Sequence, residues 1–128
     1  MKEIDIKNLK PEYDFANLKE IVNEDDHLFT FMLNKFLEST EHSKAGLMAA
    51  KKTNDWPRVS ETVHRMLPSI RFFELRTVEF WLMTIKKQIE DHEYNMIPEL
   101  IDHIVIRIDG TFCEIREEML KTGIHARQ

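Results

Sequence analysis

Residues 55–73 read Asp-Trp-Pro-Arg-Val-Ser-Glu-Thr-Val-His-Arg-Met-Leu-Pro-Ser-Ile-Arg-Phe-Phe, and this stretch decides the fold. Its apolar side chains recur at intervals of three and four residues: Trp56, Val59, Val63, Met66, Ile70 and Phe73. Such a repeat places them along one side of an α-helix that packs into a bundle. Asp55 stands at the N-cap position, and Pro57 falls in the first turn, where its missing N–H costs little. The stretch therefore predicts an amphipathic helix over residues 56–73.

The rest of the chain shows helical spacing as well. The pattern predicts a short helix capped by Asp14, a long helix over residues 26–52, a helix capped by Thr77 and a last helix over residues 96–120. The chain of 128 residues has only three glycines, too few for the tight turns of a sheet protein. We therefore expect an all-α fold, an antiparallel up-down-up-down four-helix bundle with a short extra N-terminal helix.

The expected domain organisation is a single bundle with short ends. We expect an N-terminal arm or linker over residues 1–13, the four-helix bundle over residues 14–122 and a C-terminal tail over residues 123–128. One bundle of this length matches the usual size of a single domain.

Composition narrows the classes of partner. Eighteen basic and twenty-three acidic residues give a net charge of −5, which argues against nucleic acid as the main partner. A single cysteine, Cys113, excludes an internal disulfide framework and a cysteine-based zinc cluster. No apolar run approaches the roughly 18 residues of a membrane span, and residues 1–5 lack the apolar segment of a secretory signal. We therefore expect a cytoplasmic protein without membrane insertion.

His64 differs from the other five histidines because its helix gives it a defined direction. At about 100° per residue, His64 points roughly 130° away from the apolar side of the helix, toward solvent. Ser60 and Glu61 lie one turn before it, and Leu67 and Pro68 lie one turn after it. Pro68 cannot donate a hydrogen bond to the His64 carbonyl, so we expect the helix to kink or loosen at the histidine.

Further residues extend this predicted surface. Arg65 is next to His64 in sequence, Arg71 lies two turns further on the same side, and Phe72 also points away from the apolar side. An exposed apolar group beside a reactive side chain suggests a docking surface. Two other interpretations are open: a solvated histidine without a role, and a dimer contact through Leu67, Pro68 and Phe72.

Three short motifs follow one another along the chain. Ala49-Ala50 ends the long helix, Asp55-Trp56 begins the next, and residues 63–69 read Val-His-Arg-Met-Leu-Pro-Ser. This order resembles the histidine-containing phosphotransfer (HPt) domains of bacterial multistep phosphorelays, in which an Asp-Trp pair precedes A-H-x-L-K-G-S on the second bundle helix. The resemblance covers roughly residues 14–120 and includes helix order and the outward position of the histidine.

The chain departs from the family at two positions. The family has a lysine three residues after the histidine and a glycine four residues after it, where this chain has Leu67 and Pro68. In the family that lysine is thought to neutralise the phosphoryl group or to steer the partner. Arg65 and Arg71 are the candidates to replace it, although neither stands at the family position.

The resemblance implies a phosphoryl carrier. His64 would accept a phosphoryl group from an aspartyl phosphate of one receiver domain and pass it to the aspartate of another. The implied partners are response-regulator receiver domains and a hybrid sensor histidine kinase. Mg²⁺ would come from the receiver, so no cofactor is expected on this chain, which would act as a monomer. No G-x-x-x-x-G-K-[ST] loop is present, so no kinase activity of its own is expected.

The chemistry of histidine fits that role. Imidazole titrates near pH 6.5, so much of it is a neutral nucleophile at cytoplasmic pH. We expect Nε2 of His64 to attack phosphorus, with Ser60 or Glu61 orienting the ring. The expected docking face is Leu67, Pro68, Arg71 and Phe72, together with the adjoining part of the helix over residues 26–52.

Two other functions stand beside the carrier. One is a helical protein-binding or scaffold module in which His64 is incidental, and the absent lysine favours it. The other is a metal-carrying bundle, because Glu38 and His42, and likewise Glu99 and His103, are four residues apart. Di-metal bundles, however, use inward Glu-x-x-His pairs, and the one at residues 61–64 faces outward, so no metal is expected.

Overall fold

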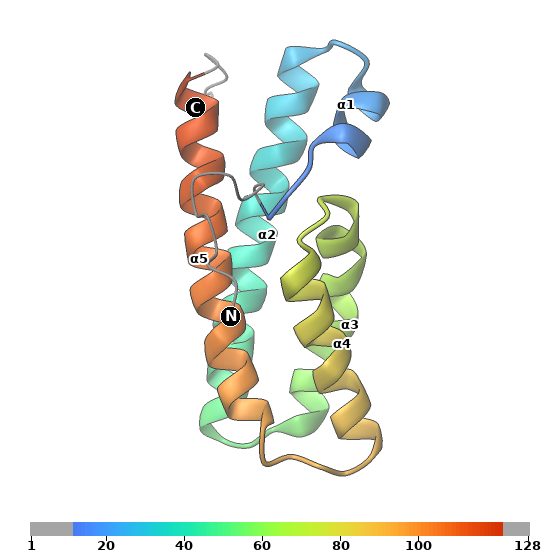
Figure 1. Ribbon diagram of the computed structural model, residues 1–128, viewed down its shortest axis with the longest axis vertical. Coiled ribbons are helices and arrows are strands. Elements are labelled where there is room, and N and C mark those ends of the chain that lie inside the picture. The colour runs from blue at the N-terminus through green and yellow to red at the C-terminus, as the bar shows by residue number, and fades with distance from the viewer. Residues whose placement is uncertain (1–11, 122–128) are drawn as a thin grey trace, which may run out of the picture.

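The computed structural model describes residues 12–121. Those residues form five helices: α1 (Ala16–Val22), α2 (Asp26–Lys52), α3 (Trp56–Phe72), α4 (Arg76–Glu90) and α5 (Ile97–Lys121). Figure 1 shows α2 to α5 side by side with alternating direction, and α1 beside the first turns of α2. This confirms the predicted all-α bundle with a short N-terminal helix. Most of the predicted arm over residues 1–13, and all of the predicted tail over residues 123–128, lie outside the described residues.

Of the N-cap residues predicted from the sequence, Asp55 is the one that the structure confirms. The Asp55 carboxylate accepts a hydrogen bond from the Arg58 N–H at 3.2 Å, so Asp55 is the predicted cap of α3. The prediction that Asp14 caps α1 was wrong by one residue, because Phe15 occupies the N-cap position; the Asp14 carboxylate accepts a hydrogen bond from the Ala16 N–H at 2.8 Å. The prediction that Thr77 caps the helix after α3 was wrong.

Thr77 lies inside α4, which begins at Arg76. Its hydroxyl donates to the Glu12 carboxylate at 2.7 Å, and its backbone N–H donates to the same group at 3.3 Å. A distant carboxylate thus takes the role that a local cap side chain usually has. The contact also holds Glu12, from the predicted arm, against the start of α4.

The core runs the length of the bundle and packs α3 between α2 and α4. Along α3 the predicted inner side is buried, except that Trp56 is half-buried. Phe36 of α2 stacks on Phe73 at a centroid distance of 4.0 Å, and its ring also meets Phe112 of α5 edge-on. Packing on two sides leaves only the outer surface of α3 open to solvent.

α1 rests against the C-terminal end of α3. The side-chain amide of Asn17 donates to the Phe72 carbonyl at 2.8 Å, and the Asp14 N–H donates to the Phe73 carbonyl at 2.9 Å. These bonds satisfy carbonyls that a helix end leaves without a partner. The short helix therefore has a fixed position beside α2 and α3.

None of the helices within residues 12–121 has the length and apolar character needed to cross a bilayer.

Candidate functional site

His64 lies in the middle of α3 with its side chain exposed, which confirms the direction predicted from the sequence. Within the described part of the chain it makes no hydrogen bond and no ion pair. α3 continues through Pro68 as far as Phe72. Because Pro68 has no N–H, the His64 carbonyl lacks the usual helical donor four residues ahead. The imidazole is therefore an accessible nucleophile on a continuous helix.

A concavity of about 560 Å³ lies beside His64, between α3 and α4. We call it the His64 pocket. It is lined by Trp56, Pro57, Ser60, Glu61, His64, Lys86, Ile89, His92 and Tyr94. Two of the predicted site residues, Ser60 and Glu61, thus share a pocket with the histidine.

An aromatic pair lines part of the His64 pocket. The rings of Trp56 and Tyr94 stack almost parallel, at an interplanar angle of 2° and a centroid distance of 5.1 Å. The Tyr94 hydroxyl lies 3.0 Å from Nδ1 of His92. These contacts connect the start of α3 to the turn between α4 and α5, so both walls of the pocket are held together.

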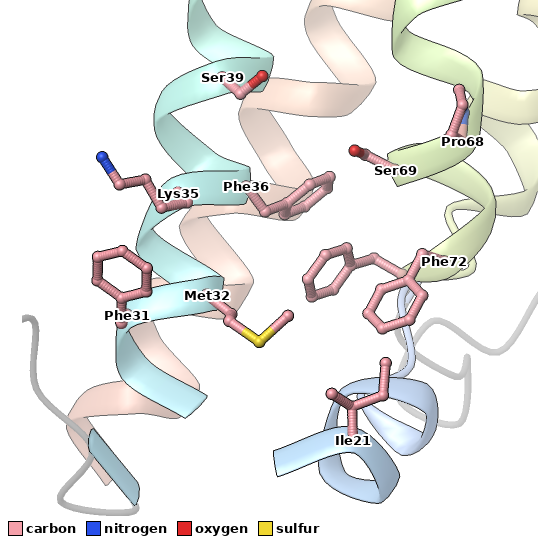
Figure 2. Close-up of a pocket in the computed structure, with 10 residues that line it drawn as sticks. Ile21, Phe31, Met32, Lys35, Phe36, Ser39, Pro68, Ser69 and Phe72 are labelled. Atoms are coloured by element: carbon pink, nitrogen blue, oxygen red, sulfur yellow. The ribbon is translucent and has the colours of Figure 1, made fainter. Parts of the chain in front are cut away.

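A second concavity, of about 520 Å³, lies on the other side of α3, and we call it the apolar groove. It is lined by Ile21, Phe31, Met32, Lys35, Phe36, Ser39, Pro68, Ser69, Phe72 and Phe73. Figure 2 shows Met32 and Phe36 of α2 directed toward Phe72 of α3, with Ile21 of α1 at one end. Ile21 and Phe31 are each 57% exposed, and they lie in the same concave surface.

The structure divides the four predicted docking residues. Pro68 and Phe72 line the apolar groove, whereas Leu67 is only 3% exposed and belongs to the core. The prediction of an exposed Leu67 was wrong because α3 packs against both α2 and α4, so its buried arc is wider than the apolar repeat indicates. Thr62, on the side that faces α2, is buried for the same reason.

The two arginines proposed to replace the family's lysine have other partners. Arg65 forms an ion pair with Glu61 at 3.6 Å. The guanidinium of Arg71 donates to Glu79 of α4 at 2.8 Å. Neither arginine lines the His64 pocket.

Sequence reasoning missed Lys86 and His92, which do line the His64 pocket. They belong to α4 and the turn after it, and no motif connects them to residues 63–69. The apolar repeat of α4 could place Lys86 near the margin of its buried side, but not opposite His64, because that depends on how α4 packs on α3.

No group of three or more histidine, cysteine, aspartate or glutamate side chains within residues 12–121 is arranged to hold a metal ion. Of the spaced pairs considered above, Glu99 and His103 approach to 4.0 Å between Oε1 and Nε2. The His103 ring lies beside Trp81 at a centroid distance of 5.7 Å.

No protein-family model, no curated protein and no solved structure matches this chain. The basis for a functional inference is therefore the geometry of His64 and of the two concavities that flank α3.

Proposed function

We propose that this protein is a phosphoryl carrier of the HPt kind, with His64 as the residue that is phosphorylated. The observation that carries the proposal is an exposed histidine that has no hydrogen-bond or ion-pair partner within residues 12–121, midway along a bundle helix, with open space beside it. The sequence resemblance over residues 55–69 supports the same role. Phosphoryl transfer depends mainly on positioning and on charge neutralisation, so a carrier needs little more than an accessible nucleophile and a docking face.

The transfer exchanges one bond to phosphorus for another. The Nε2 lone pair of neutral His64 forms a bond to the phosphorus of a receiver's aspartyl phosphate. The bond between phosphorus and the aspartyl oxygen breaks, and its electrons leave with the receiver's carboxylate. The imidazole then releases the Nδ1 proton to water. Transfer to the next receiver reverses these events, with that receiver's aspartate as nucleophile and the Mg²⁺ held by the receiver.

The apolar groove is the proposed docking face for the receiver. Pro68, in the groove, lies one helical turn after His64. A receiver that inserts apolar side chains against Phe72 and Ile21 would therefore reach the histidine with its active-site edge. Large exposed apolar side chains gathered in a concave surface are typical of protein interaction sites.

The test is a phosphotransfer assay with a phosphorylated receiver domain from the same genome. We expect label on the wild-type protein that is labile in acid and stable in alkali, as for phosphohistidine. His64→Gln should abolish the label. His42→Gln is the matched control, because His42 is also an exposed histidine on a bundle helix, and it should leave labelling unchanged.

One outcome would replace the carrier with the scaffold module. If no receiver transfers label to the protein, yet a receiver binds and Phe72→Ala abolishes that binding, the groove is functional and His64 is incidental. The groove itself is the observation that favours this second function. Label that persists in His64→Gln would likewise refute the assignment of His64.

A further inference from the structure

We infer that the His64 pocket holds the phosphoryl group of phosphorylated His64, and that Lys86 of α4 supplies the positive charge that faces it. This inference rests on the proposed function. It assigns the neutralising cation to a different helix from the one that carries the histidine.

α3 carries three arginines and no lysine, and none of the three, Arg58 included, lines the His64 pocket. The position three residues after His64 is Leu67, which is buried in the core. Arg65 pairs with Glu61, and Arg71 pairs with Glu79 and lies against the Met83 sulfur at 3.2 Å. Moving either arginine toward the phosphoryl group would break an existing ion pair.

Lys86 meets the requirements that the arginines do not. It lines the same pocket as His64, its side chain is exposed, and within residues 12–121 it has no ion-pair partner. The only carboxylate among the lining residues is Glu61, which Arg65 already partners. A lysine ammonium is a compact charge on a flexible stem, so it can move to a phosphoryl oxygen without rearranging the helices.

The surroundings of Lys86 favour an anion. His92 also lines the pocket, and its imidazole adds positive charge when protonated. The stacked Trp56 and Tyr94 rings hold the turn that carries His92 against the start of α3.

The experiment uses phosphoramidate as a small phosphodonor, so that no receiver is needed. The Nε2 atom of His64 forms the new bond to phosphorus, the donor's P–N bond breaks, and ammonia leaves. The phosphorus resonance of phosphohistidine is then followed by ³¹P NMR during a pH titration across neutrality. The full-length wild type is compared with Lys86→Gln, Lys86→Arg and Lys87→Gln, and His64→Gln identifies the resonance.

Lys87→Gln is the matched control. Lys87 is the next residue, is exposed, pairs with Asp91 at 3.4 Å and does not line the pocket. Glu61, His92 and Tyr94 face the pocket and are present in every variant, so a difference between variants reports the charge at position 86.

We expect the pKa that this titration gives for phosphohistidine to be about half a unit higher in Lys86→Gln than in the wild type, because a nearby cation favours loss of the proton. Lys86→Arg and Lys87→Gln should keep the wild-type value. Equal pKa values in Lys86→Gln and the wild type would overturn the role of Lys86 while leaving His64 as the carrier. Absence of a resonance that depends on His64 would overturn both the inference and the proposed function.

Discussion

At the scale of single residues, Tyr13 connects the chain before α1 to α5. Its hydroxyl donates to the Glu118 carboxylate at 2.8 Å. Burial, followed by that hydrogen bond, raises the pKa of Tyr13 well above its usual value. In the unfolded chain the pKa returns to about 10. Above that pH the unfolded state loses a proton that the folded state keeps, so the free energy of unfolding must fall as pH rises.

We therefore expect Tyr13→Phe to reduce the loss of stability at alkaline pH, as measured by urea unfolding at neutral and at high pH. The phenylalanine keeps the ring contact with Phe15 and removes the titrating group. Lys44 also has a raised pKa, caused first by its hydrogen bond to Asp109. It therefore also lowers the free energy of unfolding as pH rises. Lys44 is present in both proteins, so the difference belongs to Tyr13. If the free energy of unfolding fell equally with pH in the wild type and in Tyr13→Phe, the prediction would be contradicted.

At the scale of elements, the sequence predicts helices better than it predicts their contacts. The bounds of α2 match the prediction, because the apolar repeat and the cap at its start are local. Thr77 fails as a cap because α4 begins one residue before it, and the carboxylate that accepts from its N–H belongs to Glu12, 65 residues away in the sequence. Lys86 could not be assigned to the site for a related reason: α3 and α4 bring it beside His64 only through their packing.

The buried arc of α3 leads to a prediction about Leu67. Because Leu67 is 3% exposed, Leu67→Ala should lower the free energy of unfolding by about 2–5 kcal/mol, measured by chemical denaturation. The matched control is Leu120→Ala on α5, where the side chain is 69% exposed and the expected change is within about 0.5 kcal/mol. If both variants lowered the free energy of unfolding by the same small amount, Leu67 would be exposed, as the sequence predicts, and not part of the core.

At the scale of the whole molecule, α3 separates two concave surfaces with different chemistry. The His64 pocket lies toward α4 and contains lysine and histidine side chains, whereas the apolar groove lies toward α1 and α2. The groove is built from three helices, and hydrogen bonds from Asn17 and Asp14 fix α1 at its end. A partner can therefore occupy the groove without filling the pocket, so docking and phosphoryl chemistry can be separated by mutation.

Phe72→Ala tests that separation. Phe72 lines the groove and not the His64 pocket, so its removal should weaken docking of a receiver. We expect transfer from a phosphorylated receiver to fall by about tenfold, since truncating an anchoring aromatic costs on the order of 1–2 kcal/mol of binding free energy. Labelling by phosphoramidate, which needs no docking, should be unchanged.

The matched control is Phe80→Ala, because Phe80 on α4 is 68% exposed and lies outside the groove. It should leave both reactions at the wild-type rate. If Phe72→Ala slows phosphoramidate labelling as much as receiver transfer, the substitution has disturbed α3 itself and the two surfaces are coupled. If Phe80→Ala slows receiver transfer and Phe72→Ala does not, the receiver docks on α4, and the groove serves another purpose.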